Sequence, residues 1–97
     1  MNGPRLKGFL GLSVRAGQAV FGTDTCERLL LSGQGGILLM DAGASENSRK
    51  KCRELCERTG TAFALVPAGM ITEATGRDNR VMALRKGTFS EQVTGCL

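Results

Sequence analysis

The chain has no histidine, tyrosine or tryptophan and only two prolines among its 97 residues. Histidine is the commonest general base and the commonest metal ligand of proteins. Without it, nucleophilic pairs of the Ser/His or Cys/His kind are excluded. The only aromatic residues are four phenylalanines, which we expect to lie inside the fold, so the chain offers no aromatic platform on which bases stack.

The carboxylates do not form a pair suited to acid and base catalysis. They lie among basic residues or at expected helix starts, where capping and surface pairing account for them. The positions concerned are Asp41, Glu46, Glu54, Glu57 and Glu91. We therefore expect a protein that is not an enzyme and that needs no cofactor.

Long apolar runs are also missing. No stretch approaches the roughly 18 consecutive apolar residues of a membrane-spanning helix. Arg5 and Lys7 near the N-terminus are not followed by an apolar segment with a small-residue cleavage site. We expect a cytoplasmic protein that is not associated with a membrane.

The four cysteines are Cys26, Cys52, Cys56 and Cys96. Disulfides are rare in the cytoplasm, so we interpret these residues as small apolar side chains of the core. The alternative is a metal-responsive or redox-responsive domain that uses Cys52 and Cys56, four residues apart on one helix. That alternative predicts a bound metal or a thiol of low pKa, whereas our leading interpretation predicts no metal site.

Basic residues are in modest excess. Thirteen lysines and arginines against nine aspartates and glutamates give a net charge of +4 and a pI of about 9.2, which favours an anionic partner. The basic residues concentrate in the two segments 49–58 and 77–86. With 41% hydrophobic residues, the chain has the material for one packed core.

Helical and strand periodicities alternate along the chain. We expect helices over 3–16, 23–32, 46–59 and 70–75, a last helix carrying Phe89, Val93 and Leu97, and strands over 19–21, 37–40, 62–66 and 81–84. The order αβαβαβαβα predicts one domain over 1–97, an α/β fold built as a three-layer α/β/α sandwich around a mixed four-stranded sheet. Gly33, Gly35 and Gly36 precede a strand without a GxxxxGK[ST] pattern, so we interpret them as a tight helix-to-strand turn.

The segment from Gly22 to Arg28 is the most informative for function. A strand ends in glycine there and a polar helix begins, and a helix N-terminus with its unpaired N–H groups is suited to binding phosphate. Thr23, Asp24 and Thr25 occupy the first turn, and Arg28 follows Asp24 by four residues. The alternative interpretation is a capped helix with an internal pair between Asp24 and Arg28.

Five stretches of the sequence carry a family resemblance. They are LGLSVRAG (10–17), VFGTDTCER (20–28), ILLMDAGASENSRKK (37–51), VPAGMITEATG (66–76) and RVMALRKGTF (80–89). In order and spacing they resemble the superfamily of kink-turn RNA-binding ribosomal proteins, of the archaeal large-subunit seven-Ae and thirty-e type. The bacterial YlxQ-like branch is the most similar, and the resemblance covers nearly the whole chain.

This resemblance implies a sandwich that grips bent RNA at the start of its second helix and at the loop before its last strand. The matching residues are Gly22, Thr23, Asp24, Thr25 and Arg28 in the first segment and Arg77 and Arg80 in the second, with Arg49 and Lys50 extending the phosphate contacts. It implies a monomer that binds structured RNA, ribosomal or kink-turn-like, with protein partners in translation or transcription.

Two departures from the family pattern support an alternative. Asp24 stands where the family has an asparagine, and Thr25 stands where it has an acidic residue. Asp24 lacks amide donors and Thr25 lacks a carboxylate acceptor for a guanine edge. The alternative function is a protein-interaction adaptor that keeps the fold and has lost specific RNA recognition.

Overall fold

The computed structural model describes residues 1–97, and helices and strands alternate along the whole chain. The elements are α1 (Gly3–Arg15), β1 (Ala19–Phe21), α2 (Thr23–Leu31), β2 (Gly35–Asp41), α3 (Glu46–Thr59), β3 (Ala62–Val66), α4 (Met70–Thr75), β4 (Val81–Arg85) and α5 (Thr88–Gly95). This confirms the predicted order. None of the helices is both long enough and apolar enough to cross a membrane.

Local sequence explains several of these boundaries. The Asn2 side chain accepts a hydrogen bond from the Arg5 N–H at 3.2 Å, and the Ser45 hydroxyl oxygen accepts one from the Ser48 N–H at 3.2 Å. Both are N-caps, which satisfy N–H groups that a helix start leaves unpaired. Gly60 ends α3 at φ +67°, a left-handed conformation that glycine adopts without strain.

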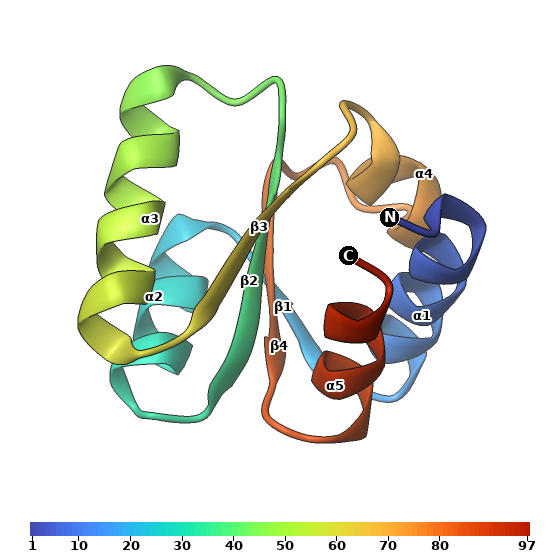
Figure 1. Cartoon of the computed structure of the whole chain (residues 1–97), viewed down its shortest axis with the longest axis horizontal. Coiled ribbons are helices and arrows are strands. Elements are labelled where there is room, and N and C mark those ends of the chain that lie inside the picture. The colour runs from blue at the N-terminus through green and yellow to red at the C-terminus, as the bar shows by residue number, and fades with distance from the viewer.

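The four strands form one mixed sheet in the order β1-β4-β2-β3. Strands β2 and β3 are parallel, and β4 runs antiparallel to both β2 and β1. Helices α2 and α3 cover one face of the sheet, and α1, α4 and α5 cover the other (Figure 1). The predicted three-layer α/β/α sandwich is confirmed.

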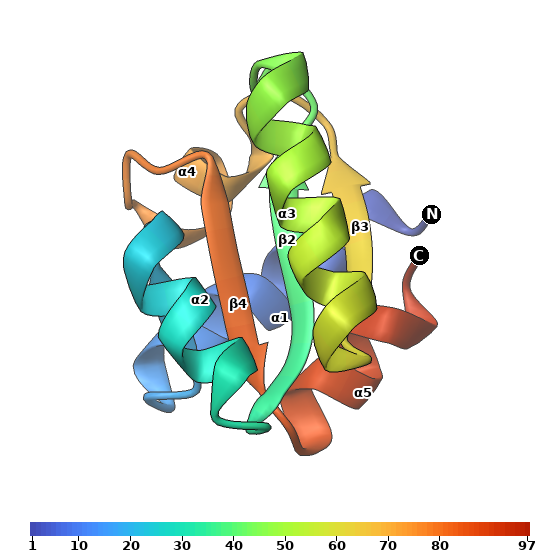
Figure 2. The same ribbon diagram turned by 90° about the vertical axis from the view of Figure 1, so that its left-hand side faces the viewer.

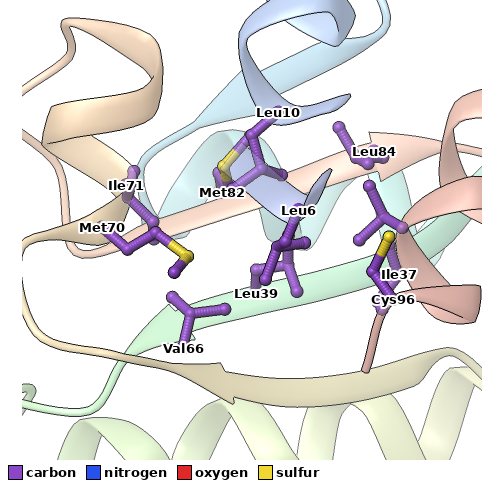
Figure 3. Close-up of a cluster of buried hydrophobic side chains, with 11 residues drawn as sticks. Leu6, Leu10, Ile37, Leu39, Val66, Met70, Ile71, Met82, Leu84 and Cys96 are labelled. Atoms are coloured by element: carbon purple, nitrogen blue, oxygen red, sulfur yellow. The ribbon is translucent and has the colours of Figure 1, made fainter. Parts of the chain in front are cut away.

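Strand β2 supplies side chains to both faces of the sheet. Ile37 and Leu39 point into the core under α1, α4 and α5 (Figure 3), while Leu38 and Met40 point into the core under α2 and α3. All four are buried. A continuous apolar run is what a central strand covered on both faces requires.

At one end of the strands, which is at the top in Figure 2, β1, β2 and β3 end and β4 begins. We call this end of the sheet the upper edge, as distinct from the edge strands β1 and β3. The N-termini of α2, α3 and α4 and the loop 76–80 also lie there, because each helix follows a strand that ends at this edge. Residues separated by more than fifty positions in the sequence are thereby brought together.

Two expectations about side chains were wrong. Leu97 lies beyond the end of α5 and is 42% exposed, because α5 ends at Gly95. The four phenylalanines are half-buried rather than internal. Arginine guanidinium groups lie over three of these rings, Arg5 over Phe9, Arg53 over Phe63 and Arg77 over Phe21.

The interpretation of Gly35 and Gly36 as part of a turn was also wrong. Both lie within β2, and only Gly33, with φ +81°, has a turn conformation. A Cβ atom on Gly36 would lie 2.4 Å from the Ser90 Oγ, and one on Gly35 would lie 2.7 Å from the Leu30 Cδ1. Close packing of neighbouring helices explains these two glycines.

Candidate nucleic-acid interface

The turn between β1 and α2 is anchored to the start of β4. The Gly22 N–H donates to the Val81 carbonyl at 3.3 Å, and the Gly22 carbonyl accepts from the Cys26 N–H at 3.0 Å. Gly22 has φ +89°, which a side chain would strain, and no side chain caps the helix. The first N–H groups of α2 are therefore directed toward solvent, where an anion can accept their hydrogen bonds.

The loop 76–80 lies against the same turn. The Arg77 guanidinium carbon is 5.1 Å from the centroid of the Phe21 ring, within the range of a cation–π contact. Because Phe21 immediately precedes Gly22, this contact holds the loop beside the first turn of α2. Figure 2 shows the loop and this turn at the same corner of the molecule.

Arg80 connects the loop 76–80 to the turn after β2. Its Nη1 donates to the Gly43 carbonyl at 2.7 Å, and its own carbonyl accepts from the Asp41 N–H at 2.8 Å. The side chain remains exposed. Arg80 thus places a positive charge between the N-termini of α2 and α3.

The buried carboxylate of Asp41 fixes the loops behind this surface. It accepts hydrogen bonds from the Gly69 N–H at 2.9 Å and from the Gly43 N–H at 2.6 Å. These bonds, helped by the nearby Arg80 charge, outweigh desolvation and lower the pKa of Asp41 below its ordinary value. From the sequence, Asp41 was expected only to cap a helix start or to pair at the surface, and this role was missed.

The structure brings five of the predicted RNA-binding residues to the upper edge. Gly22, Thr23 and Asp24 begin α2, while Arg77 and Arg80 approach from the loop before β4. No ion pair joins Asp24 to the arginine four residues later, since the one ion pair of the molecule is between residues 7 and 73. The alternative of an internal helix pair is not what the structure shows.

The other predicted residues lie elsewhere. Thr25 and Arg28 face a shallow hollow on the flank of α2, next to β1. Arg49 and Lys50 share a stripe of α3 with Arg53, whose guanidinium lies over Phe63 of β3. Arg49 lies in the first turn of α3 and so toward the upper edge, but none of these three basic residues lines a hollow together with the start of α2.

The cysteines on α2 and α3 belong to the core. Cys26, Cys52 and Cys56 are free and buried in one apolar cluster. Burial raises the pKa of Cys26 to about 12 and that of Cys56 to about 11, the opposite direction to a reactive thiol. No three potential metal-ligating side chains lie together in the structure.

Comparisons with known proteins relate this chain to others through the fold. No family model and no curated protein sequence matches it. Among solved structures, a protein of unknown function from Bacillus halodurans superimposes with a TM-score of 0.89 at 22% identity, over 95% of each chain.

Two further solved structures come from proteins whose names state a function. The Giardia lamblia 15.5kD RNA binding protein superimposes with a TM-score of 0.73 at 11% identity, over 97% of this chain and 88% of that one. The archaeal translation termination factor aRF1 matches 80% of this chain but only 23% of its own, with a TM-score of 0.62 at 19% identity. The chain therefore shares its fold with an RNA-binding protein, and identities this low show the fold alone.

Proposed function

We propose that this protein binds structured RNA, ribosomal or kink-turn-like, in the cytoplasm and catalyses no reaction. The contact between Arg77 and Phe21 carries the proposal. This contact brings together, at one corner of the sheet, the two segments that bind RNA in the family that this chain resembles. The upper edge of the sheet is the surface we assign to the RNA.

The electrostatics of this corner suit a phosphate backbone. Uncapped N–H groups and the positive end of the α2 dipole face solvent beside the guanidinium groups of Arg77 and Arg80. The carboxylates of Asp24 and Asp78 partly offset this positive charge. We therefore expect the phosphate contacts to come from these N–H and guanidinium groups and not from a broad basic surface. The Giardia lamblia 15.5kD RNA binding protein, which has the same fold, supports the assignment.

The test is a filter-binding titration with a kink-turn hairpin, a straight duplex and a single strand, across a series of salt concentrations. Phosphate contacts release counterions, so affinity falls as salt rises. We expect Arg77→Ala to weaken binding roughly two- to tenfold, because one solvent-exposed phosphate contact contributes about 0.5–1.4 kcal/mol.

Arg5→Ala is the matched control, because Arg5 also lies over a phenylalanine, Phe9, but on α1 beneath the other face of the sheet. It should bind as the unchanged protein does. Absence of binding to any folded RNA at low salt contradicts the proposal, as does an equal effect of the two substitutions.

The adaptor alternative rests on Asp24 and Thr25, which depart from the family pattern. Its prediction is distinct. Partners captured from a lysate that persist after nuclease treatment support the adaptor, whereas partners lost on that treatment support RNA binding.

A further inference from the structure

A shallow hollow lies on the flank of α2, beside the edge strand β1. Three residues of α2 and the C-cap residue that follows it contribute to the hollow at spacings of three or four, which places them on one face of the helix. The hollow is lined by Val20, Thr25, Arg28, Leu29, Ser32 and Arg85. Arg85, the last residue of β4, was not among the residues that the sequence singled out for binding.

This hollow differs in charge from the other three on the surface. Each of the others includes at least one glutamate, which offsets the nearby cations. Here two arginines, Arg28 and Arg85, line the same space and no carboxylate residue does. Guanidinium groups bind phosphate oxygens in bidentate fashion, so an unneutralised pair favours an oxyanion.

The hydroxyl groups of the hollow are not equivalent. The Ser32 hydroxyl, at the C-cap of α2, already donates to the Leu29 carbonyl at 2.7 Å. Thr25 is thus the hydroxyl that remains to donate into the hollow, between Arg28 and the upper edge. The donors therefore continue from the first turn of α2 down its flank.

The distance between Arg85 and the upper edge indicates how long a ligand must be to contact both. Its N–H donates to the Gln18 carbonyl at 2.9 Å, just before β1, whereas Val81 accepts from Gly22 at the upper edge. At about 3.3 Å per residue, Val81 and Arg85 are roughly 13 Å apart along β4. One phosphate does not span that distance, but a nucleic-acid strand does.

The geometry points to Arg28 and Arg85 as a second phosphate-binding site, which receives the backbone of the bound RNA as the strand continues from the upper edge along β1. This inference rests on the proposed function and extends it. The upper edge grips the RNA at its bend, and the hollow holds the flanking strand.

The experiment measures binding of the kink-turn hairpin by the full chain and by Arg85→Gln, Arg28→Gln and Arg53→Gln. Arg53 is the matched control, since it lies beside β3 at the opposite edge of the sheet. We expect Arg28→Gln and Arg85→Gln each to weaken binding roughly two- to tenfold. Each should also lower the slope of log K against log salt by about 1, and Arg53→Gln should change neither quantity.

Circular dichroism and thermal unfolding verify that each variant is folded, and Arg85→Lys, which keeps the charge, should retain the slope. If Arg85→Gln binds like Arg53→Gln while Arg77→Ala still weakens binding, the second site is wrong and the proposed function stands. If the unchanged protein binds no folded RNA at low salt, both are wrong.

Discussion

At the scale of single residues, the Asp41 side chain links two loops that lie behind the candidate interface. It is the only charged residue buried in the fold, and its carboxylate joins two loops whose glycines, Gly43 and Gly69, lie on different sides of β3 in the sequence. Both loops border the upper edge. The shape of the candidate interface therefore depends on a residue that does not face it.

We expect Asp41→Asn to lower the free energy of unfolding by about 1–3 kcal/mol near neutral pH, since an amide presents a donor to one of two N–H groups. The pKa of Asp41 is lowered in the folded state, so its stabilisation is complete above the ordinary value of 3.8. It is lost as the pH falls through the lowered folded pKa. Urea unfolding at several pH values measures both effects.

Asp78→Asn is the control, because Asp78 is exposed on the loop before β4. It should leave stability within about 0.5 kcal/mol of the unchanged protein. The gap between Asp41→Asn and the unchanged protein should narrow as the pH falls below 3.8. A gap that stays constant under acid contradicts the linkage.

At the scale of the elements, Gly36 tests how closely α5 approaches β2. We expect Gly36→Ala to destabilise the fold by about 1–3 kcal/mol, because the new methyl group meets buried Ser90 and the Lys86 backbone. Gly8→Ala is the matched substitution, since a Cβ at Gly8 in α1 meets nothing within 4 Å. It should stabilise by about 0.5–1 kcal/mol, and urea unfolding of both variants measures the contrast. Equal effects contradict the packing argument.

Local signals predicted most of the elements. Proline and glycine bound α4, which follows Pro67 and ends at Gly76 with φ +73°, and Ser45 and Gly60 cap α3. Sequence alone did not explain Gly36, because its constraint comes from Ser90, more than fifty residues later. A glycine in a turn and a glycine under a helix have the same local sequence signature.

The candidate site was predictable to the same extent. The turn at Gly22 and the loop 76–80 were found from sequence and resemblance, but the Phe21–Arg77 contact that joins them is non-local. Arg85 was missed because its importance depends on lining the same hollow as Arg28, which is 57 residues earlier in the sequence. The order of the strands in the sheet decides which strand residues lie beside which helix, and local sequence patterns do not reveal that order.

At the scale of the whole molecule, two cores share one sheet. Leu38 and Leu39 are neighbours in β2 and both are fully buried, yet Leu38 packs beneath α2 and α3 while Leu39 packs beneath the other three helices (Figure 3). The backbone of the same strand supports both layers. Loss of either core therefore removes support for the other, so we expect the chain to unfold as one unit.

Leu38→Ala and Leu39→Ala should each lower the free energy of unfolding by about 2–5 kcal/mol, as cavities in a packed core do. Urea titrations followed by circular dichroism and by amide resonances of α3 and α5 should show one coincident transition for each variant. Leu12→Ala, at a site that is 47% exposed, should change stability by less than about 0.5 kcal/mol. If α3 unfolds in Leu38→Ala while α5 keeps its protected amides, the layers are independent, and the RNA-binding corner, which draws on both, is not a rigid surface.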